Sequence, residues 1–235
     1  MTPPITIAID GPSGSGKSSV SKEVARRLGV AYLDTGAMYR AATWWCLREG
    51  VDLTDTQAVT AVVDTMPLTM SVNPNDPTVR VDDINISEAI RDTGISTKVS
   101  AVATNIEVRE ILRTLQRNRI TAERTGGFSQ GKGIVAEGRD ITTVVAPDAD
   151  VRILLTASEE ARLRRRAQDV HGTADAQAVE ATKDEVLRRD ADDSTVTQFQ
   201  IAADGVITLD SSDLDFEQTI TAVLNIIEHT TTPAQ

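Results

Sequence analysis

A glycine-rich segment of eight residues constrains the fold of this chain more than any other feature of its sequence. It reads Gly11-Pro12-Ser13-Gly14-Ser15-Gly16-Lys17-Ser18 and matches the pattern G-x-x-x-x-G-K-[S/T] at every defined position. Residues 5–10 (ITIAID) precede it with the apolar, β-branched pattern of a buried strand, and residues 17–28 follow it as a predicted helix that ends at Gly29. Strand, loop and helix in this order are the setting in which the pattern binds phosphate, so we expect an α/β fold built around a phosphate-binding loop.

The predicted loop offers several kinds of contact to a nucleoside triphosphate. Its glycines let backbone N–H groups surround phosphate oxygens, and the start of the following helix adds partial positive charge. Lys17 is expected to bridge the β- and γ-phosphate oxygens, and Ser18 to offer its hydroxyl to the Mg²⁺ that accompanies ATP. The predicted ATP-binding residues are Gly11, Pro12, Ser13, Gly14, Ser15, Gly16, Lys17, Ser18 and Ser19. The loop by itself does not distinguish a kinase from an ATPase or a nucleotide-dependent switch.

Four further short apolar runs predict the remaining strands of a parallel sheet. Helical patterns separate them, and they comprise residues 30–34, 133–137, 151–155 and 205–209. Strands that alternate with helices form a parallel sheet covered on both faces, and such sheets bind ligands beyond the carboxyl ends of their strands. The sequence therefore predicts that the phosphate-binding loop lies at the ligand-binding edge of the sheet.

Three other segments depart from this simple alternation. Residues 67–87 change to a two-residue hydrophobic period with turn residues between the runs, which predicts a small antiparallel sheet. Residues 97–124 predict one long polar helix, and residues 158–170 and 176–189 predict a charged helical pair. We expect these segments to surround the ligand site that the parallel sheet provides.

The overall charge limits the ligands that the protein can hold. The formal net charge of −11 makes it a poor non-specific nucleic-acid binder, because neutralised phosphates drive that binding. The arginines nevertheless cluster in residues 109–124 and 162–166, where they can focus positive charge on a small anion. No apolar run reaches the length of about 18 residues that a membrane span requires, and the lone Cys46 is expected to be a packed thiol. We expect a cytoplasmic protein without membrane or nucleic-acid partners, and the acidic balance favours a monomer.

Three segments besides the loop carry recognisable motifs. They are Asp34–Arg40 (DTGAMYR), Gly138-Arg139-Asp140, and residues 189–194 (RDADDS). In this order, over nearly the whole chain, the four motifs resemble those of bacterial cytidylate kinases of the nucleoside monophosphate kinase superfamily. The resemblance implies a P-loop NTPase fold of the adenylate-kinase-like type, with a five-stranded parallel sheet, a small antiparallel β insert and a helical lid. It divides the chain into a core (residues 1–36, 95–157 and 190–235), a monophosphate-binding region (37–94) and a lid (158–189).

The resemblance also assigns roles to individual residues. The implied catalytic residues are Lys17, Arg139, Arg162 and Arg166. The implied substrate-binding residues are Thr35, Arg40, Ser100, Arg109, Arg139, Asp140, Arg189 and Asp193. Of these, Arg40 and Arg139 are expected to clamp the acceptor monophosphate, because planar guanidinium groups bind phosphate bidentately. Asp34 is expected to order water around Mg²⁺ or to hold Lys17.

The base and the sugar are assigned to other members of this set. Ser100, Arg109 and Asp140 match the base-reading positions, since a carboxylate can accept from the cytosine amino group and the other two can donate to its acceptors. Arg189 and Asp193 match ribose and phosphate contacts. One position departs from the family, which usually carries an arginine where this chain has Val196. That departure leaves open either a looser base preference or an arginine supplied from elsewhere in the chain.

The predicted reaction is in-line transfer of a phosphoryl group from ATP·Mg²⁺ to the 5′-phosphate of CMP or dCMP. The acceptor is already an oxyanion at neutral pH, so no strong general base is required, and His171 and His229 are expected to be peripheral. Three alternatives remain at this point: a pyrimidine kinase that also takes UMP, a kinase of a small metabolite such as shikimate or gluconate, and a nucleotide-dependent switch. A switch needs no second anion site, so the distribution of arginines favours a kinase.

Overall fold

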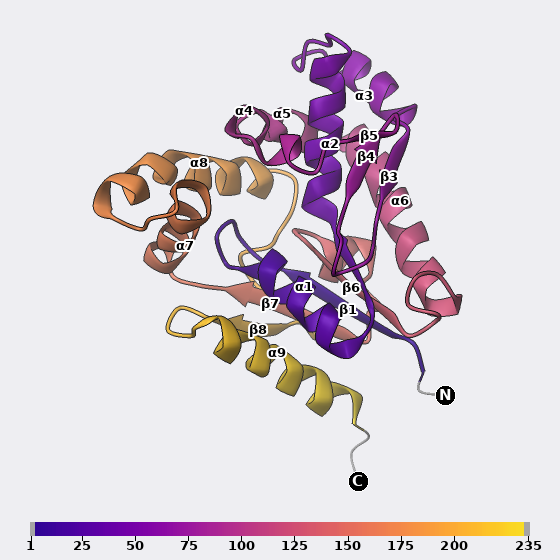
Figure 1. Cartoon of the computed structure of the whole chain (residues 1–235), viewed down its shortest axis with the longest axis vertical. Helices are drawn as coiled ribbons and strands as arrows, with labels where there is room; N and C mark the ends of the chain where they lie inside the picture. Colours follow the sequence, from indigo (N-terminus) through magenta and orange to yellow (C-terminus); the bar gives the residue numbers. More distant parts are fainter. Residues whose placement is uncertain (1–2, 233–235) are drawn as a thin grey trace.

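The computed structural model describes residues 3–232, so the ends of the predicted core, residues 1–2 and 233–235, lie outside it. Within that range the chain forms one parallel sheet of five strands in the order β2-β6-β1-β7-β8 (Figure 1). These strands are β1 (Ile5–Asp10), β2 (Ala31–Asp34), β6 (Gly133–Gly138), β7 (Val151–Thr156) and β8 (Ile207–Asp210). The predicted fold class is confirmed, and each of the five predicted strands lies within two residues of its predicted position.

Alternation along the buried strands divides the core into two layers. Ile7 and Ile9 point to the face covered by α1 (Lys17–Leu28) and α9 (Phe216–Thr231), whereas Ala8 points to the face covered by α2 (Thr35–Arg48) and α6 (Ile106–Thr125). Successive strand side chains point to opposite faces, so a continuous apolar run is what a strand buried on both faces requires. The carboxyl ends of β1, β2 and β6 thereby meet at one edge, which is where the site lies.

The predicted antiparallel insert is present and packs against α2. It consists of β3 (Leu68–Met70), β4 (Val79–Val81) and β5 (Ile84–Asn85), in that spatial order. The preceding α3 (Thr56–Asp64) was not predicted, although Asp55 caps it by accepting a hydrogen bond from the N–H of Ala58 at 3.0 Å. After the insert come two short turns, η1 (Ala89–Arg91) and α4 (Thr93–Ser96).

The single long helix predicted for residues 97–124 is wrong. The structure has α5 (Val99–Ala103) and then α6, with Asn105 between them in an extended conformation. The Asn105 side chain accepts hydrogen bonds from the N–H groups of Glu107 and Val108, which is a helix cap. Asparagine is a favoured cap residue, so it begins a new helix here instead of continuing the previous one.

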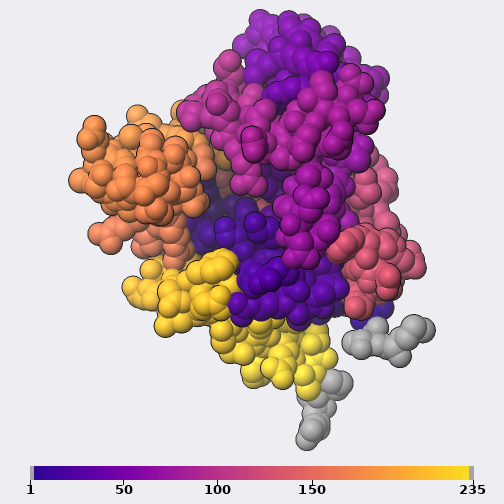
Figure 2. All heavy atoms as spheres, in the orientation of Figure 1, coloured from indigo at the N-terminus to yellow at the C-terminus, as the bar shows by residue number. Residues whose placement is uncertain are grey.

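The charged helical pair is present as α7 (Glu159–His171) and α8 (Ala176–Ser194). Because α8 runs to Ser194, the predicted boundary between lid and core at residue 190 falls inside this helix. Figure 2 shows the pair as a mass separated from the insert by a hollow, with the N-terminal part of the chain at its floor. Among the described helices, none is both long and apolar enough to cross a membrane.

Candidate functional site

The carboxyl ends of the central strands open into a pocket. It lies between the phosphate-binding loop, the N-terminal half of α2, the end of β6 with the segment after it, α5, α6, and the α7–α8 pair. Most of the predicted site residues border it: Ser13, Gly14, Gly16, Lys17, Ser18, Ser19, Asp34, Thr35, Arg40, Arg109, Arg139, Asp140, Arg166, Arg189 and Asp193. The structure therefore brings both the predicted ATP-binding loop and the predicted acceptor residues to one place.

The loop has the backbone conformation that its glycines were expected to allow. Gly14 and Gly16 have φ of 76° and 85°, in the left-handed region that suits glycine. A Cβ on Gly14 would lie 2.5 Å from the carbonyl oxygen of Arg162, so α7 packs directly on the loop. Lys17 folds back, and its Nζ donates to the carbonyl of Pro12 at 3.3 Å.

The electrostatics of the loop favour an anion. Burial, and then the charge of Arg139, lower the pKa of Lys17 to about 8. The Ser15 hydroxyl is buried and has no hydrogen-bond partner within residues 3–232. A bound phosphate would supply negative charge to Lys17, which would favour its protonated form.

Glu137, on β6, is a site residue that the sequence analysis missed. Its Oε1 accepts hydrogen bonds from Ser18 Oγ at 2.7 Å and from the Tyr32 hydroxyl at 3.3 Å. Burial, and then the charge of Asp34, raise the pKa of Glu137 to about 7. The available signal was an acidic residue in an otherwise apolar strand run just before Gly138-Arg139-Asp140, since a buried carboxyl is retained only with partners.

Asp34 connects the end of β2 to α2. Its Oδ1 caps α2 by accepting from the N–H of Ala37 at 2.8 Å, and its Oδ2 pairs with Nη2 of Arg40 at 3.0 Å. Asp34 lines the pocket but contacts neither Lys17 nor Ser18 in the described structure, and Glu137 is the acid that contacts Ser18. Thr35 donates its hydroxyl to the carbonyl of Glu137 at 2.8 Å, which ties α2 to β6.

Asp140 is the centre of a buried ion-pair cluster with α6. Its Oδ2 accepts from Arg109 Nη2 at 2.6 Å and from Arg113 Nη2 at 2.7 Å. The guanidinium carbon of Arg109 also lies 5.6 Å from the centroid of the Tyr39 ring. No described residue donates a hydrogen bond to Oδ1 of Asp140, so this second oxygen is available to a ligand in the pocket.

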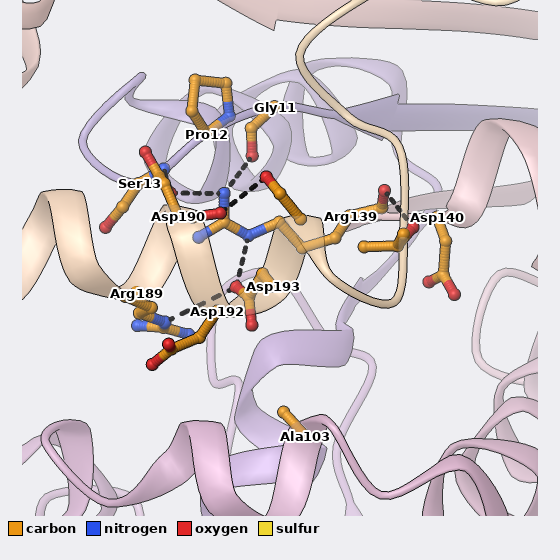
Figure 3. Close-up of polar contacts among 12 residues, drawn as sticks. Gly11, Pro12, Ser13, Ala103, Arg139, Asp140, Arg189, Asp190, Asp192 and Asp193 are labelled. Atoms are coloured by element: carbon orange, nitrogen blue, oxygen red, sulfur yellow. Dashed lines mark hydrogen bonds and ion pairs between the residues drawn. The ribbon is translucent and has the colours of Figure 1, made fainter.

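The neighbouring Arg139 points the other way, into α8 (Figure 3). Its Nη1 lies 2.8 Å from Asp190 Oδ1, and its Nε lies 3.1 Å from Asp193 Oδ2. Nη1 also donates to the carbonyl oxygen of Gly11 at 3.3 Å. The predicted phosphate clamp is thus paired with two carboxylates in this structure, while its Nη2 has no partner among the residues described.

Asp190, which pairs with Arg139, also accepts from two further donors. Arg162 Nη1 pairs with its Oδ2, and the N–H of Ser13 donates to its Oδ1 at 3.0 Å. Arg162 Nη1 also donates to the carbonyl of Ser13 at 2.9 Å, and Arg162 does not border the pocket. The predicted lid arginine is therefore bound to the loop both directly and through a carboxylate of α8.

Asp10 fixes the segment that carries Arg139 and Asp140. Its carboxylate accepts hydrogen bonds from the N–H groups of Ile141 and Thr142 at 2.9 and 2.8 Å and from the Thr142 hydroxyl at 2.6 Å. These contacts hold the first residues of η2 (Ile141–Val145), a π-helical turn after β6. Burial raises the pKa of Asp10 to about 6, although the same hydrogen bonds act in the opposite direction.

The last two pocket arginines each have a carboxylate partner on α8 but retain an Nε without a hydrogen bond in the described range. Arg166 pairs with Glu185 at 2.6 Å, and Arg189 lies 4.0 Å from Asp193. Burial, and then the charge of Arg139, lower the pKa of Arg189 to about 10. Its Nε is buried and has no hydrogen-bond partner in the described range. These features suit a site that an anion completes.

Five predicted site residues do not border the pocket, namely Gly11, Pro12, Ser15, Arg162 and Ser100, and of these Ser100 borders a different one. On α5, Val99 and Ala103 line the pocket, and Ser100 borders a separate groove near Leu47 and Arg188. Val99 and Ala103 are four residues apart and share a helix face, whereas Ser100 lies about 100° around the axis. Val196 follows α8, and its N–H donates to the carbonyl oxygen of Asp193 at 3.2 Å.

Comparison with known proteins gives one consistent result. A sequence model described as "Cytidylate kinase" matches residues 7–229. A curated cytidylate kinase of Streptomyces avermitilis is 45% identical over 227 residues, which cover 96% of this chain and 94% of that relative. Cytidylate kinases of Cutibacterium acnes and Rhodococcus jostii are each 44% identical, over 96% and 100% of this chain and 97% and 99% of the relatives, respectively.

Proposed function

The chain belongs to the cytidylate kinase family, and on that premise we propose that it transfers the γ-phosphoryl group of ATP to the 5′-phosphate of CMP and dCMP. The observation that carries the proposal is the pocket itself. It sets a phosphate-binding loop next to a second group of cationic side chains, from Arg40, Arg139 and Arg189. Two anion positions side by side are what a phosphoryl donor and a phosphorylated acceptor require.

We assign the donor side to the residues of the loop. Their backbone N–H groups and Lys17 neutralise the triphosphate, and this charge compensation is the main contribution that a protein makes to phosphoryl transfer. Arg162 and Arg166, on α7, are proposed to act on the transferring group once the acceptor is bound. For Arg162 this requires a phosphate to replace Asp190 as its partner.

We assign the acceptor side to α2, α6, α8 and the segment after β6. Arg40, Arg139, Arg189 and Asp193 are proposed to hold the phosphate and sugar, and Thr35 borders the same position. Oδ1 of Asp140 is proposed to accept a hydrogen bond from the amino group of cytosine, with Arg109 beside it. A base without that amino group would leave a buried carboxylate oxygen unpaired, which penalises it. Ser100 is left out of this set because it borders another groove.

The residues at the loop also fit the magnesium ion that ATP carries. Ser18 Oγ and the buried carboxylate of Glu137 are 2.7 Å apart, an oxygen-only donor set, and Mg²⁺ in kinases is bound by one or two such groups together with substrate phosphates. Ser18 would hold the ion, and Glu137 would accept hydrogen bonds from its water ligands. When bound, the ion supplies positive charge that stabilises the charge developing on the phosphate oxygens.

The test is an ADP-release assay with ATP·Mg²⁺ and a panel of CMP, dCMP, UMP, AMP and shikimate. We expect turnover with CMP and dCMP, without release of inorganic phosphate, and a loss of turnover in Lys17→Met. Comparable turnover with UMP would support the broader pyrimidine kinase, and turnover with shikimate alone would support a small-metabolite kinase. An ATP-binding protein that phosphorylates none of the panel would overturn the proposal in favour of the switch.

A further inference from the structure

Phe199 is a fully buried aromatic residue that belongs to neither layer of the core. The chain has three phenylalanines, and the other two, Phe128 and Phe216, are 47% and 49% exposed. Phe199 is 1% exposed, yet the two hydrophobic clusters of the described residues do not include it. It lies in an irregular segment between α8 and β8. Its burial therefore needs an explanation other than core packing.

The explanation lies in what its ring contacts. The guanidinium carbon of Arg139 lies over the Phe199 ring, 4.2 Å from the centroid. This is well inside the distance of roughly 6 Å at which a cation is attracted to the face of an aromatic ring. Arginine suits such a contact because its planar group can stack on a ring while its edges still donate hydrogen bonds.

The same segment also holds the backbone of Arg139. Thr197 donates its hydroxyl to the carbonyl oxygen of Arg139 at 3.3 Å. The side chain of Arg139 is fixed along two edges by Asp190 and Asp193 of α8 and by the Gly11 carbonyl. With the ring of Phe199 against one face, Nη2 is the part of the guanidinium that stays without a partner in the described structure.

We infer that Phe199 is a positioning residue for the acceptor phosphate: its ring fixes the plane of the Arg139 guanidinium so that the free edge faces the bound nucleoside monophosphate. The inference rests on the proposed function. The ion pairs and the Gly11 carbonyl contact the edges of the guanidinium, whereas the ring contacts its face and so opposes a tilt of the plane. A ring of fixed position removes that freedom before the ligand arrives, which reduces the ordering that binding must accomplish.

The expected effect is specific to the acceptor. Phe199→Leu removes the ring and keeps an apolar side chain, and we expect KM for CMP to rise roughly 5- to 30-fold, the range that a partly desolvated cation–π contact supports. KM for ATP should change by less than about twofold, because the inference places the effect of the ring on the acceptor phosphate alone. Phe199→Tyr retains the ring and should restore most of the affinity for CMP. Thermal melting of each variant checks that the comparison is made on folded protein.

A second variant separates the electrostatic contact from simple filling of space. Replacement of Phe199 by a trifluorinated phenylalanine, introduced as a non-natural amino acid, keeps the shape of the ring and weakens the negative charge of its face. The inference requires KM for CMP to rise in this variant as well, with KM for ATP unchanged, and calorimetric titration with CMP should show the same loss.

The outcomes of this series are distinct. If the unmodified protein turns over CMP and the fluorinated variant matches it, Phe199 acts by packing alone and the inference is wrong. The inference is also wrong if Phe199→Leu raises both KM values equally. If the unmodified protein turns over no monophosphate, the proposed function fails first and the inference falls with it.

Discussion

Arg139 and Asp140 are adjacent in the sequence, yet they connect to different parts of the molecule. Asp140 pairs with Arg109 and Arg113 of α6, a helix of the core layer. Arg139 pairs with Asp190 and Asp193 of α8, a helix on the far side of the pocket. The Asp140 cluster joins the segment after β6 to α6, whereas the Arg139 cluster joins the same segment to α8 of the helical pair.

The difference indicates two uses of the same chemistry. A buried ion pair between packed elements of the core pre-arranges a pocket. It is costly to break because one partner is left buried and unpaired. An arginine that borders a ligand pocket can exchange its carboxylate partner for an anionic ligand, since the guanidinium already has the charge that the ligand needs. In the proposed function, a phosphate would compete with Asp190 for Arg139 and Arg162, whereas Arg113 would keep its pairing with Asp140.

Asp140→Ala tests the fixed side of the comparison and should have the largest effect. It leaves two buried guanidinium groups without their carboxylate, so we expect the free energy of unfolding to fall by about 3–5 kcal/mol. Urea denaturation of the ligand-free protein measures this change. The matched control is Glu110→Gln, which removes the exposed partner of Arg113 and should lower the free energy by less than about 0.5 kcal/mol. Equal effects of the two substitutions would contradict the assignment of a buried cluster.

Arg139→Ala tests the exchangeable side through activity. We expect kcat/KM for CMP to fall roughly 100-fold, which corresponds to about 2.7 kcal/mol of lost transition-state stabilisation. Initial-rate kinetics with each substrate varied in turn measure the effect. Arg117→Ala is the control, because Arg117 is an exposed arginine on α6 that does not border the pocket. A fall in kcat/KM below threefold would show that Arg139 is not the phosphate clamp.

Asp190→Asn tests the link that α8 makes to Arg139, to Arg162 and to the phosphate-binding loop. The substitution retains the shape of the side chain but removes the negative charge that binds Arg139, Arg162 and the Ser13 N–H. We expect the free energy of unfolding to fall by roughly 1.5–3 kcal/mol. Amide hydrogen exchange should accelerate in α7 and α8 and stay unchanged in α6. Uniform acceleration throughout the chain would show that Asp190 supports global stability instead of the link.

The ionisation of Asp190 should make the stability of the protein depend on pH, with an effect of a few degrees in Tm. Burial alone would raise the pKa of Asp190, but the charge of Arg139, the Ser13 hydrogen bond and the charge of Arg162 outweigh it and lower the pKa below the ordinary 3.8. A lowered pKa in the folded state means that the ionised carboxylate stabilises the protein above the unfolded pKa and loses that contribution as the pH falls through the folded pKa. The difference in Tm between the unmodified protein and Asp190→Asn should thus be constant from about pH 7 to 5 and shrink below about pH 4. A difference that grows in acid would contradict the ion pair.

The parts that the sequence predicted are those where local chemistry decides the outcome. The loop, its flanking strand and helix, and the alternating insert depend on patterns within a few residues, and their positions are confirmed. The interruption at Asn105 was missed because an asparagine in a polar stretch is compatible both with a helix interior and with a cap. Glu137 was missed because its partner Ser18 is 119 residues away along the chain.

The ion pairs of the site likewise join residues that are far apart in the sequence. Arg109, Arg139 and Asp140 were singled out, but nothing local indicates that Arg139 turns to α8 while Asp140 turns to α6. Ser100 was chosen through resemblance, and the rotation of a short helix sets it on another surface. Phe199 carried no sequence signal at all, since its role depends on a contact with a residue 60 positions earlier.

The pairing of β7 with β8 has a further consequence. The two strands are neighbours in register from Ile153 opposite Ile207 to Thr156 opposite Asp210, and the chain between them, residues 157–206, contains α7 and α8. A parallel crossover needs only about a dozen residues, and doubling the length of a flexible connection adds only about 0.6 kcal/mol of closure entropy. The sheet thus fixes both ends of the enclosed segment. The length of this segment could therefore change at little entropic cost while the pairing of β7 with β8 is kept.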